Sequence, residues 1–152
     1  MGTALESLGR RLVGRWTTEA KHPAMPGTTI AGSSQFEWLD GEQFLIFRSH
    51  YDHPDFPDAI SIIGDTDGLQ MHYFDTRGVH RLFELTVSGE SWMIAMSSDA
   101  HSRSWASGDR PFSQRMTFTF EQADQKMSGK GELSYDDVNW DDDLEVVCQR
   151  ES

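Results

Sequence analysis

The sequence predicts an all-β protein, a ten-stranded up-and-down antiparallel β-barrel with a short N-terminal helix closing one end. Three observations lead to this fold class. Short segments that alternate apolar and polar residues follow one another along the chain, as half-buried strands do. The connections between these segments switch between tight turns and longer loops. No long helical pattern is found after the N-terminus.

The chain opens with a helix and continues with strands. Leu5, Leu8 and Leu12 recur at helical spacing, which predicts a short amphipathic helix. The clearest strand is FSQRMTFTFE, in which Phe118 and Phe120 share one face and the threonines share the other. The ten predicted strands are approximately 14–20, 28–39, 43–51, 58–65, 69–75, 79–87, 91–97, 112–121, 126–135 and 142–150.

The connections predict a barrel with a closed base and an open mouth. Long or irregular loops follow the first, third, seventh and ninth strands, and short turns follow the strands between them. A three-residue connection after the fifth strand is an exception. Because alternate loops of a meander lie at opposite ends, one end carries the tight turns and the other carries the long loops. The sequence contains no internal repeat or linker, so we expect a single domain over residues 1–152.

Composition and charge limit the partners. The chain is 37% hydrophobic and 25% charged, and its five Trp and nine Phe suit strands and the lining of an apolar cavity. The formal charge of −12 disfavours binding to nucleic acids or to anionic membranes. Cys148 is the only cysteine, so no intrachain disulfide can form. Cys148 shares a strand face with Leu144 and Val146, which predicts a buried thiol. No signal peptide or membrane-spanning run is found, which predicts a cytoplasmic protein.

The start of the chain resembles lipocalin-like (calycin) proteins. In that family a short helix precedes a Gly-x-Trp on the first strand, matched here by Gly14, Arg15 and Trp16. The stretches HPDFPDAISIIGDTDG and MHYFDTRGVHR are similar to segments of uncharacterised bacterial lipocalin-like proteins of about this length. The resemblance implies a cupped β-barrel that holds a small apolar ligand, and it supplies no known activity.

The two ends of the chain are expected to meet at the base. The first strand starts there, the last strand finishes there, and barrel closure makes the two strands neighbours. We therefore predict that Trp16 lies near Arg150. The lipocalin resemblance implies the same arrangement, with the motif Trp packed under an Arg from the end of the barrel.

The stretch HYDHPDFPDA is a candidate metal site. His50 and His53 could bind one ion with help from Asp52 or Asp55. However, alternate residues of a strand point to opposite faces, so the two histidines converge only if the loop folds back. Two prolines favour a rigid loop at the rim of the barrel instead, with aspartates that accept local hydrogen bonds.

A second acidic stretch, DDVNWDDDLEVVC, is similar to a calcium-binding EF-hand loop. Asp137, Asn139 and Asp141 match its first three ligand positions. The match fails where the geometry is strict, because Asp142 replaces the required Gly and Cys148 replaces the bidentate Glu. We therefore predict an acidic hairpin loop, and no metal.

Haem is a further alternative, suggested by the nitrobindins, lipocalin-like barrels of similar length. They bind haem through a histidine late in the chain. Here His101 is the last histidine and the final three predicted strands contain none, so we expect no cofactor.

Polar residues on otherwise apolar strand faces are the candidate ligand-binding groups. Arg81 shares a face with Phe83, Tyr73 shares one with Met71, and the pair Arg48 and His50 shares one with two apolar residues. A charge inside a barrel is costly unless it is paired or used, so an inward Arg suggests a ligand carboxylate or an internal salt bridge. The predicted ligand-binding set is Arg48, His50, Tyr73, Arg81 and Phe118.

The four long loops are predicted to surround the mouth. They would bring together His22, His53, His101, Trp105 and Trp140. Proline-containing loops hold an entrance open, while the fourteen-residue loop over 98–111 could move as a lid. His50 is expected to differ from the other loop residues by pointing inward near the top of its strand.

The function expected is the binding of a small apolar or amphipathic molecule in the barrel. One alternative is an enzyme in the same cavity, with His50, His80 or Tyr73 as acid or base. Another is a barrel packed shut that acts as an oligomeric scaffold, and a homodimer is left open. The ligand-binding protein and the enzyme need a cavity, whereas the scaffold predicts none.

Overall fold

A computed structural model describes residues 3–97 and 110–151 of the chain. The helix α1 (Ala4–Leu12) is capped by Thr3, whose hydroxyl accepts a hydrogen bond from the Glu6 N–H at 3.1 Å. Leu5, Leu8 and Leu12 are buried, as the helical spacing predicts. No helix of the described residues is long and apolar enough to cross a membrane.

Ten antiparallel strands close into one barrel, in the order β1-β10-β9-β8-β7-β6-β5-β4-β3-β2. This confirms the predicted fold class, and each strand lies within two residues of its predicted bounds. The strands are β1 (Gly14–Lys21), β2 (Ile30–Trp38), β3 (Phe44–Tyr51), β4 (Ala59–Asp65), β5 (Leu69–Asp75), β6 (His80–Ser88), β7 (Ser91–Met96), β8 (Ser113–Glu121), β9 (Lys126–Ser134) and β10 (Asp141–Arg150).

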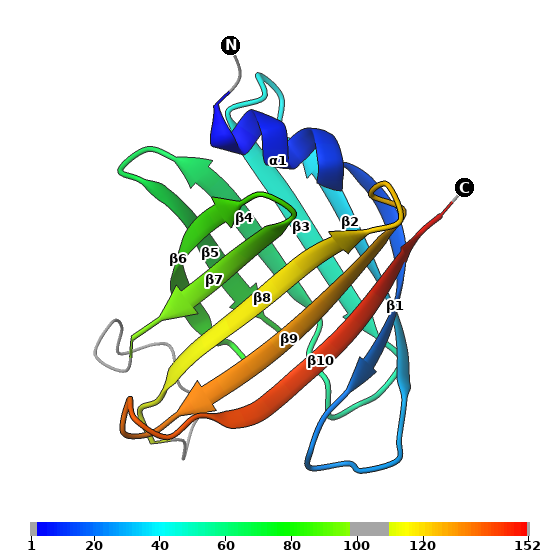
Figure 1. Ribbon diagram of the computed structural model, residues 1–152, viewed down its shortest axis with the longest axis vertical. Helices are drawn as coiled ribbons and strands as arrows, with labels where there is room; N and C mark the ends of the chain where they lie inside the picture. Colours follow the sequence, from blue (N-terminus) through cyan, green and yellow to red (C-terminus); the bar gives the residue numbers. More distant parts are fainter. Residues whose placement is uncertain (1–2, 98–109, 152) are drawn as a thin grey trace.

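The two ends of the barrel differ, as the loop pattern predicts. The turns after β2, β4, β6 and β8 lie at the end that carries α1, and the loops after β1, β3 and β9 lie at the opposite end (Figure 1). Gly68 and Gly89 have positive φ angles of 85° and 59° in two of the tight turns, a conformation that a residue without Cβ adopts at little cost.

Trp16 and Arg150 close the base. The Trp16 side chain is fully buried, its Nε1–H donates to the Leu12 carbonyl at 2.9 Å, and the Arg150 guanidinium lies 4.2 Å from its ring centroid. The two residues are direct partners in the β1–β10 register. The predicted contact between Trp16 and Arg150 is therefore confirmed.

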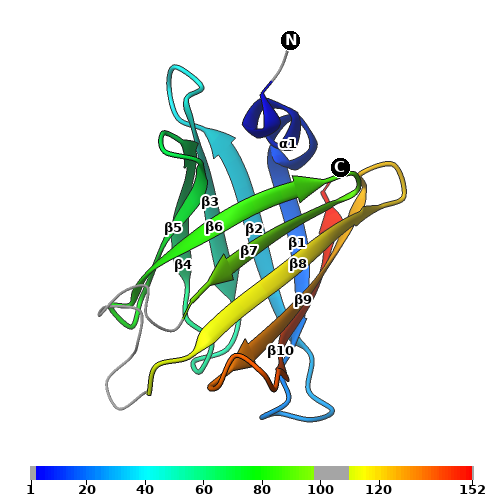
Figure 2. The same ribbon diagram turned by 60° about the vertical axis from the view of Figure 1, so that its left-hand side comes forward.

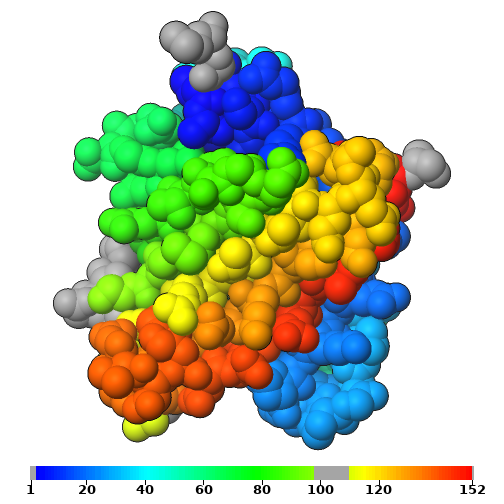
Figure 3. Space-filling view, viewed as in Figure 1, coloured from blue at the N-terminus to red at the C-terminus, as the bar shows by residue number. Residues whose placement is uncertain are grey.

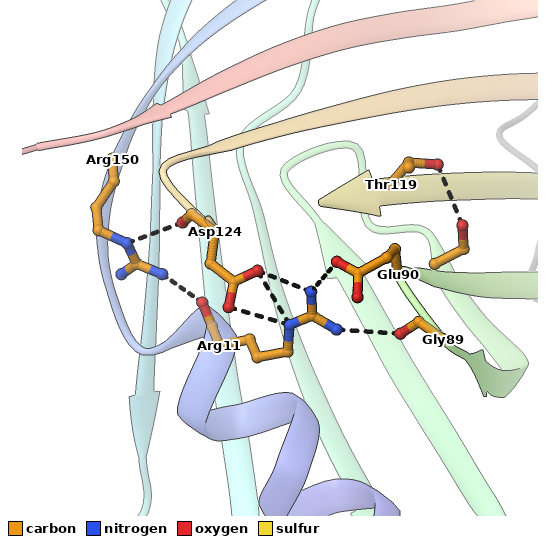
Figure 4. Close-up of polar contacts among 7 residues, drawn as sticks. Arg11, Gly89, Glu90, Thr119, Asp124 and Arg150 are labelled. Carbon is orange, nitrogen blue, oxygen red and sulfur yellow. Dashed lines mark hydrogen bonds and ion pairs between the residues drawn. The ribbon is translucent and has the colours of Figure 1, made fainter. Parts of the chain in front are cut away.

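A second arginine fastens the helix to the barrel (Figure 4). The Arg11 guanidinium binds the Asp124 carboxylate at 2.7 Å and the Glu90 carboxylate at 2.6 Å, and it covers the Phe120 ring at 4.1 Å. Arg150 donates to the Asp124 and Arg11 carbonyls. The end of α1 is thereby tied to the β6–β7 and β8–β9 turns.

Large side chains fill the base below the helix. Trp92, Phe36 and Leu45 are almost completely buried, and Trp92 stacks on Phe118 with centroids 4.1 Å apart. The wall over β7–β9 is continuous in space-filling view, with α1 seated at its upper end (Figure 3). Any internal space therefore has to lie between this packed base and the loop end.

Candidate functional site

A cavity of about 650 Å³ lies inside the barrel. An eight-stranded barrel is just wide enough to be filled by its own side chains or to hold one small ligand, so ten strands leave more room. Volumes of roughly 300–1,000 Å³ are usual for small-molecule sites. The cavity contradicts the alternative of a barrel packed shut.

The two sides of the cavity are chemically different. Strands β1–β4 contribute four small hydroxyl residues together with Phe47 and Tyr51, whereas strands β5–β9 contribute mostly large apolar side chains. Figure 2 shows where these strands lie in the barrel. On the hydroxyl side the Thr18 and Ser34 oxygens lie 3.2 Å apart. The other small hydroxyl residues are Ser49 and Ser61, and the main apolar residues of the opposite strands are Met71, Phe83, Ile94, Met116, Phe118 and Met127. The small hydroxyl residues on this side leave space that larger side chains would fill.

A chain of polar side chains joins three strands and the β1–β2 loop inside the barrel. Arg81 on β6 donates to the Gln114 side-chain oxygen on β8 at 3.3 Å. The Gln114 amide donates to the Asp143 carboxylate on β10 at 3.1 Å. His22, just after β1, meets the other Asp143 oxygen at 2.9 Å. Each of these residues lies near the loop end of its strand, so the polar groups gather toward the mouth.

Asp143 reaches the cavity because β10 is irregular. The β9–β10 register shifts between Asp142 and Glu145, as it does where a β-bulge inserts a residue. As a result Asp143 and Leu144, which are adjacent, both line the cavity. Regular alternation would turn one of them to the outer surface.

Arg81 is a buried cation. It is 7% exposed, and its guanidinium lies 5.7 Å from the Tyr73 ring centroid and 5.2 Å from that of Phe112. Burial lowers the pKa of Arg81 below its ordinary value, because removal from water disfavours the charged form. The side chain remains charged at neutral pH because a free guanidinium titrates above about pH 12.

Tyr73, Asp75 and Arg77 form a second polar group. The Tyr73 hydroxyl and the Arg77 guanidinium both donate to one Asp75 oxygen at 2.7 Å. Burial alone would raise the pKa of Asp75, but the hydrogen bonds from Arg77 and Tyr73 outweigh it and lower that pKa. The pKa of Tyr73 is raised, mainly by burial and then by this bond to a carboxylate. The Tyr73 hydroxyl therefore acts as a fixed donor.

His22 and Cys148 are two titratable groups that line the cavity. Among the described residues that line the cavity, His22 is the one histidine. Its Nδ1 accepts a hydrogen bond from the Ala24 N–H at 3.0 Å. Its Nε2 must then carry the proton that Asp143 accepts, so both ring nitrogens are engaged. Burial raises the pKa of the Cys148 thiol to about 11, so Cys148 is a weak nucleophile at neutral pH.

The structure corrects the positions predicted for Arg48 and His50. Both side chains lie on the outer face of β3, about half exposed, and Arg48 binds Glu37 at 2.9 Å. His50 meets Asp52 at 2.8 Å and Asp58 at 2.9 Å. The inner face of β3 instead carries Leu45, Phe47, Ser49 and Tyr51. Both faces of this strand are apolar in part, so alternation alone did not distinguish them.

Other predicted residues divide between the inside and the outside. Arg81, Tyr73 and Phe118 line the cavity, and so does His22 at its mouth. His80 lies on the outer face, stacked on Phe74 with centroids 4.7 Å apart, so its proposed role inside the barrel is wrong.

Two of the predicted mouth residues do not line the cavity. His53 packs against Phe56, which does line the cavity, with their ring centroids 5.7 Å apart. Trp140 packs outside, with the Arg115 guanidinium 3.8 Å from its ring centroid. His101 and Trp105 lie outside the described residues.

Donor groups of the acidic loop and of His22 are engaged in local hydrogen bonds. The described residues contain no group of three or more His, Cys, Asp or Glu that could hold a metal ion. In the acidic loop Asp136 accepts from the Val138 and Asn139 N–H groups at 2.9 and 2.7 Å, which commits its carboxylate to the turn. For haem, the His22 nitrogens are already engaged as described.

Sequence reasoning missed Gln114, Asp143 and Arg77. Gln114 was detectable, because it shares the period-two face of Met116 and Phe118. Asp143 depends on the irregularity in β10, and Arg77 depends on how the β5–β6 turn folds toward the cavity. These two carry no signal in the sequence.

Comparisons with known proteins support the fold. No family model matches the chain, and no curated protein matches it. Among solved structures the chain is similar to Rv2717c from M. tuberculosis, with a TM-score of 0.70 and 16% identity over 100% of this chain and 99% of that one. A redesigned β-barrel matches with a TM-score of 0.51 and 10% identity over 95% of each chain. At these identities the likeness shows the barrel architecture alone, and the lipocalin-like resemblance stays a prediction.

Proposed function

We propose that this protein binds a small, mostly apolar molecule inside its barrel. The observation that carries the proposal is the 650 Å³ cavity, with methionine and phenylalanine side chains inside and polar groups toward the mouth. Flexible methionines adapt to irregular ligands, and a few placed polar groups orient them.

Uptake of the neutral fluorescent probe N-phenyl-1-naphthylamine tests the proposal. Binding in an apolar cavity should raise and blue-shift its emission. Phe118→Asp places a charge on the apolar wall and should abolish uptake. The matched control is Thr117→Asp, because Thr117 is the exposed neighbour on the outer face of β8. Wild-type protein that leaves the emission unchanged would contradict the proposal.

Two outer residues provide a further control. Arg48→Glu and His53→Ala should leave uptake nearly unchanged, because neither side chain lines the cavity. Mass spectrometry of the purified protein for co-purified small molecules then addresses the identity of the ligand.

A further inference from the structure

A row of hydroxyl side chains crosses the inner wall of the barrel. Thr18 on β1 contacts Ser34 on β2, with 3.2 Å between their oxygens. Ser34 is the direct partner of Ser49 in the β2–β3 register. Ser61 on β4 lies diagonally across from Ser49, whose own direct partner is Ala59. The four hydroxyl residues all line the cavity, so the row extends over four adjacent strands.

Two hydroxyls of this row are left without a partner by the described part of the chain. The Thr18 hydroxyl contacts both the Ser34 hydroxyl and the Cys148 thiol. By contrast, neither Ser49 nor Ser61 makes a side-chain hydrogen bond to another described residue. Ser61 is only 2% exposed, yet it lines the cavity. Because a buried hydroxyl without a partner is costly, its hydrogen bond has to come from a molecule inside the cavity.

The wall opposite this row is apolar. In the closed ring of ten strands, β3 lies opposite β8 and β4 lies opposite β9. Strand β8 contributes Met116 and Phe118 to the lining, and β9 contributes Met127. Methionine sulfur makes favourable contacts with aromatic rings, and phenylalanine stacks on them. The cavity therefore offers hydrogen bonds along one side and aromatic contacts along the other.

The chemistry of the row limits the polar groups that a ligand can present to it. A serine hydroxyl carries no charge and can both donate and accept a hydrogen bond, so it matches a ligand hydroxyl group. A ligand that presents only apolar surface here would displace solvent from Ser49 and Ser61 without replacing its hydrogen bonds. Such a displacement lowers affinity.

We propose that the cavity selects aromatic molecules whose hydroxyl groups lie along one edge, as in polyphenols. The hydroxyl edge lies against Ser49 and Ser61, and the rings lie against Met116, Phe118 and Met127. This inference rests on the proposed function and adds the chemical class of the ligand. A linear amphiphile with a single polar head would meet the row at one point only.

Competition between two isomers tests the inference on the wild-type protein. 3,3′-Dihydroxybiphenyl can turn both hydroxyl groups to one edge, whereas 4,4′-dihydroxybiphenyl carries them at opposite ends. The isomers share the same rings and the same polar groups, so they lose similar hydration on entering the cavity. We expect the 3,3′ isomer to displace N-phenyl-1-naphthylamine at about fivefold lower concentration than the 4,4′ isomer, as one additional hydrogen bond would give.

The same competition separates this inference from the proposed function. Probe uptake with equal displacement by the two isomers, or with a preference for the 4,4′ isomer, would overturn the inference and leave the proposed function intact. Absence of binding by the probe and by both isomers would overturn both.

Substitution of Ser61 assigns the preference to the hydroxyl row. In Ser61→Ala the two isomers should displace the probe equally, because an unpartnered hydroxyl has been removed. Ser33→Ala is the matched control, since Ser33 is an exposed serine on the outer face of β2, and it should keep the preference. Comparing two isomers on one variant cancels any change that affects both. A preference retained in Ser61→Ala would overturn the inference.

Methionine NMR locates the bound rings without a variant. In protein with ¹³C-labelled methionine methyl groups, ring currents of the bound 3,3′ isomer should shift the Met116 and Met127 resonances. Met93 is the internal control, because it lies on the outer face of β7 and does not line the cavity. A bound isomer that leaves the Met116 and Met127 resonances unshifted would overturn the inference.

Discussion

The backbone of Gly9 lies directly against the indole ring of Trp38. A Cβ atom added to Gly9 would lie 2.2 Å from Trp38 Cζ2 and 2.7 Å from Cη2, well inside the contact distance of carbon atoms. Gly9 is the buried residue of α1 that lets the helix approach β2. The seat of the helix on the base therefore depends on the absence of one side chain.

Gly9→Ala should destabilise the protein although alanine favours helices. Helix propensity would contribute about 1 kcal/mol in favour of alanine. Overpacking against an indole costs about 1–3 kcal/mol and should prevail. Ser7→Ala, at an exposed position of the same helix, should change stability by a few tenths of a kcal/mol at most. Urea unfolding measures the free energy of unfolding of the two variants. A Gly9→Ala variant more stable than the wild type would show that the helix can move away from Trp38.

Trp16→Ala should lower the free energy of unfolding by about 3–5 kcal/mol, because it leaves a cavity in the base. The substitution also removes the ring under Arg150 and the donor to the Leu12 carbonyl. Thr17→Ala is the control, since Thr17 is an exposed neighbour on β1. Equal unfolding midpoints for the two variants would contradict the assigned role of Trp16.

His50 should titrate above the ordinary histidine pKa. Its Nδ1 bond to Asp58 raises that pKa most, and its Nε2 bond to Asp52 adds to the effect. A carboxylate only accepts, so both bonds require the doubly protonated ring. These two bonds stabilise the folded protein fully below the unfolded-state histidine pKa of about 6.5. Their contribution is lost as the pH rises through the higher pKa of His50 in the folded state.

NMR titration of the His50 ring checks this expectation. Asp58→Asn should move the His50 pKa back toward its ordinary value, whereas Asp55→Asn, on the same loop, should have little effect. An unchanged His50 titration in Asp58→Asn would contradict the pairing.

Calcium should not change the melting temperature. The Asp136 carboxylate already accepts from the Asn139 and Val138 backbone N–H groups, which hold its pKa far below the ordinary range. Those bonds stabilise the loop above the unfolded-state pKa and are lost as the pH falls through the folded-state value. Melting curves with calcium and with chelator test this. A stabilisation that grows with calcium concentration would reveal a bound ion, because ligands of the native state act by mass action.

The sequence by itself determined the strands, the helix and the two ends of the barrel. These features are local, because alternation, helical spacing and turn residues act over a few positions. The meeting of Trp16 with Arg150 was also predictable, since a closed meander makes its first and last strands neighbours.

Only the tertiary structure decided which face of each ambiguous strand points inward. On β3, Ile46 and Phe47 offer apolar surface to opposite sides, and pairing across the closed barrel turned Phe47 onto Phe36 at 4.2 Å. Arg48 and His50 were thereby turned outward. The irregularity in β10 likewise brought Asp143 inside. The physical reason is that a shift of one residue reverses every side chain of a strand, and only the complete ring of strands determines that register.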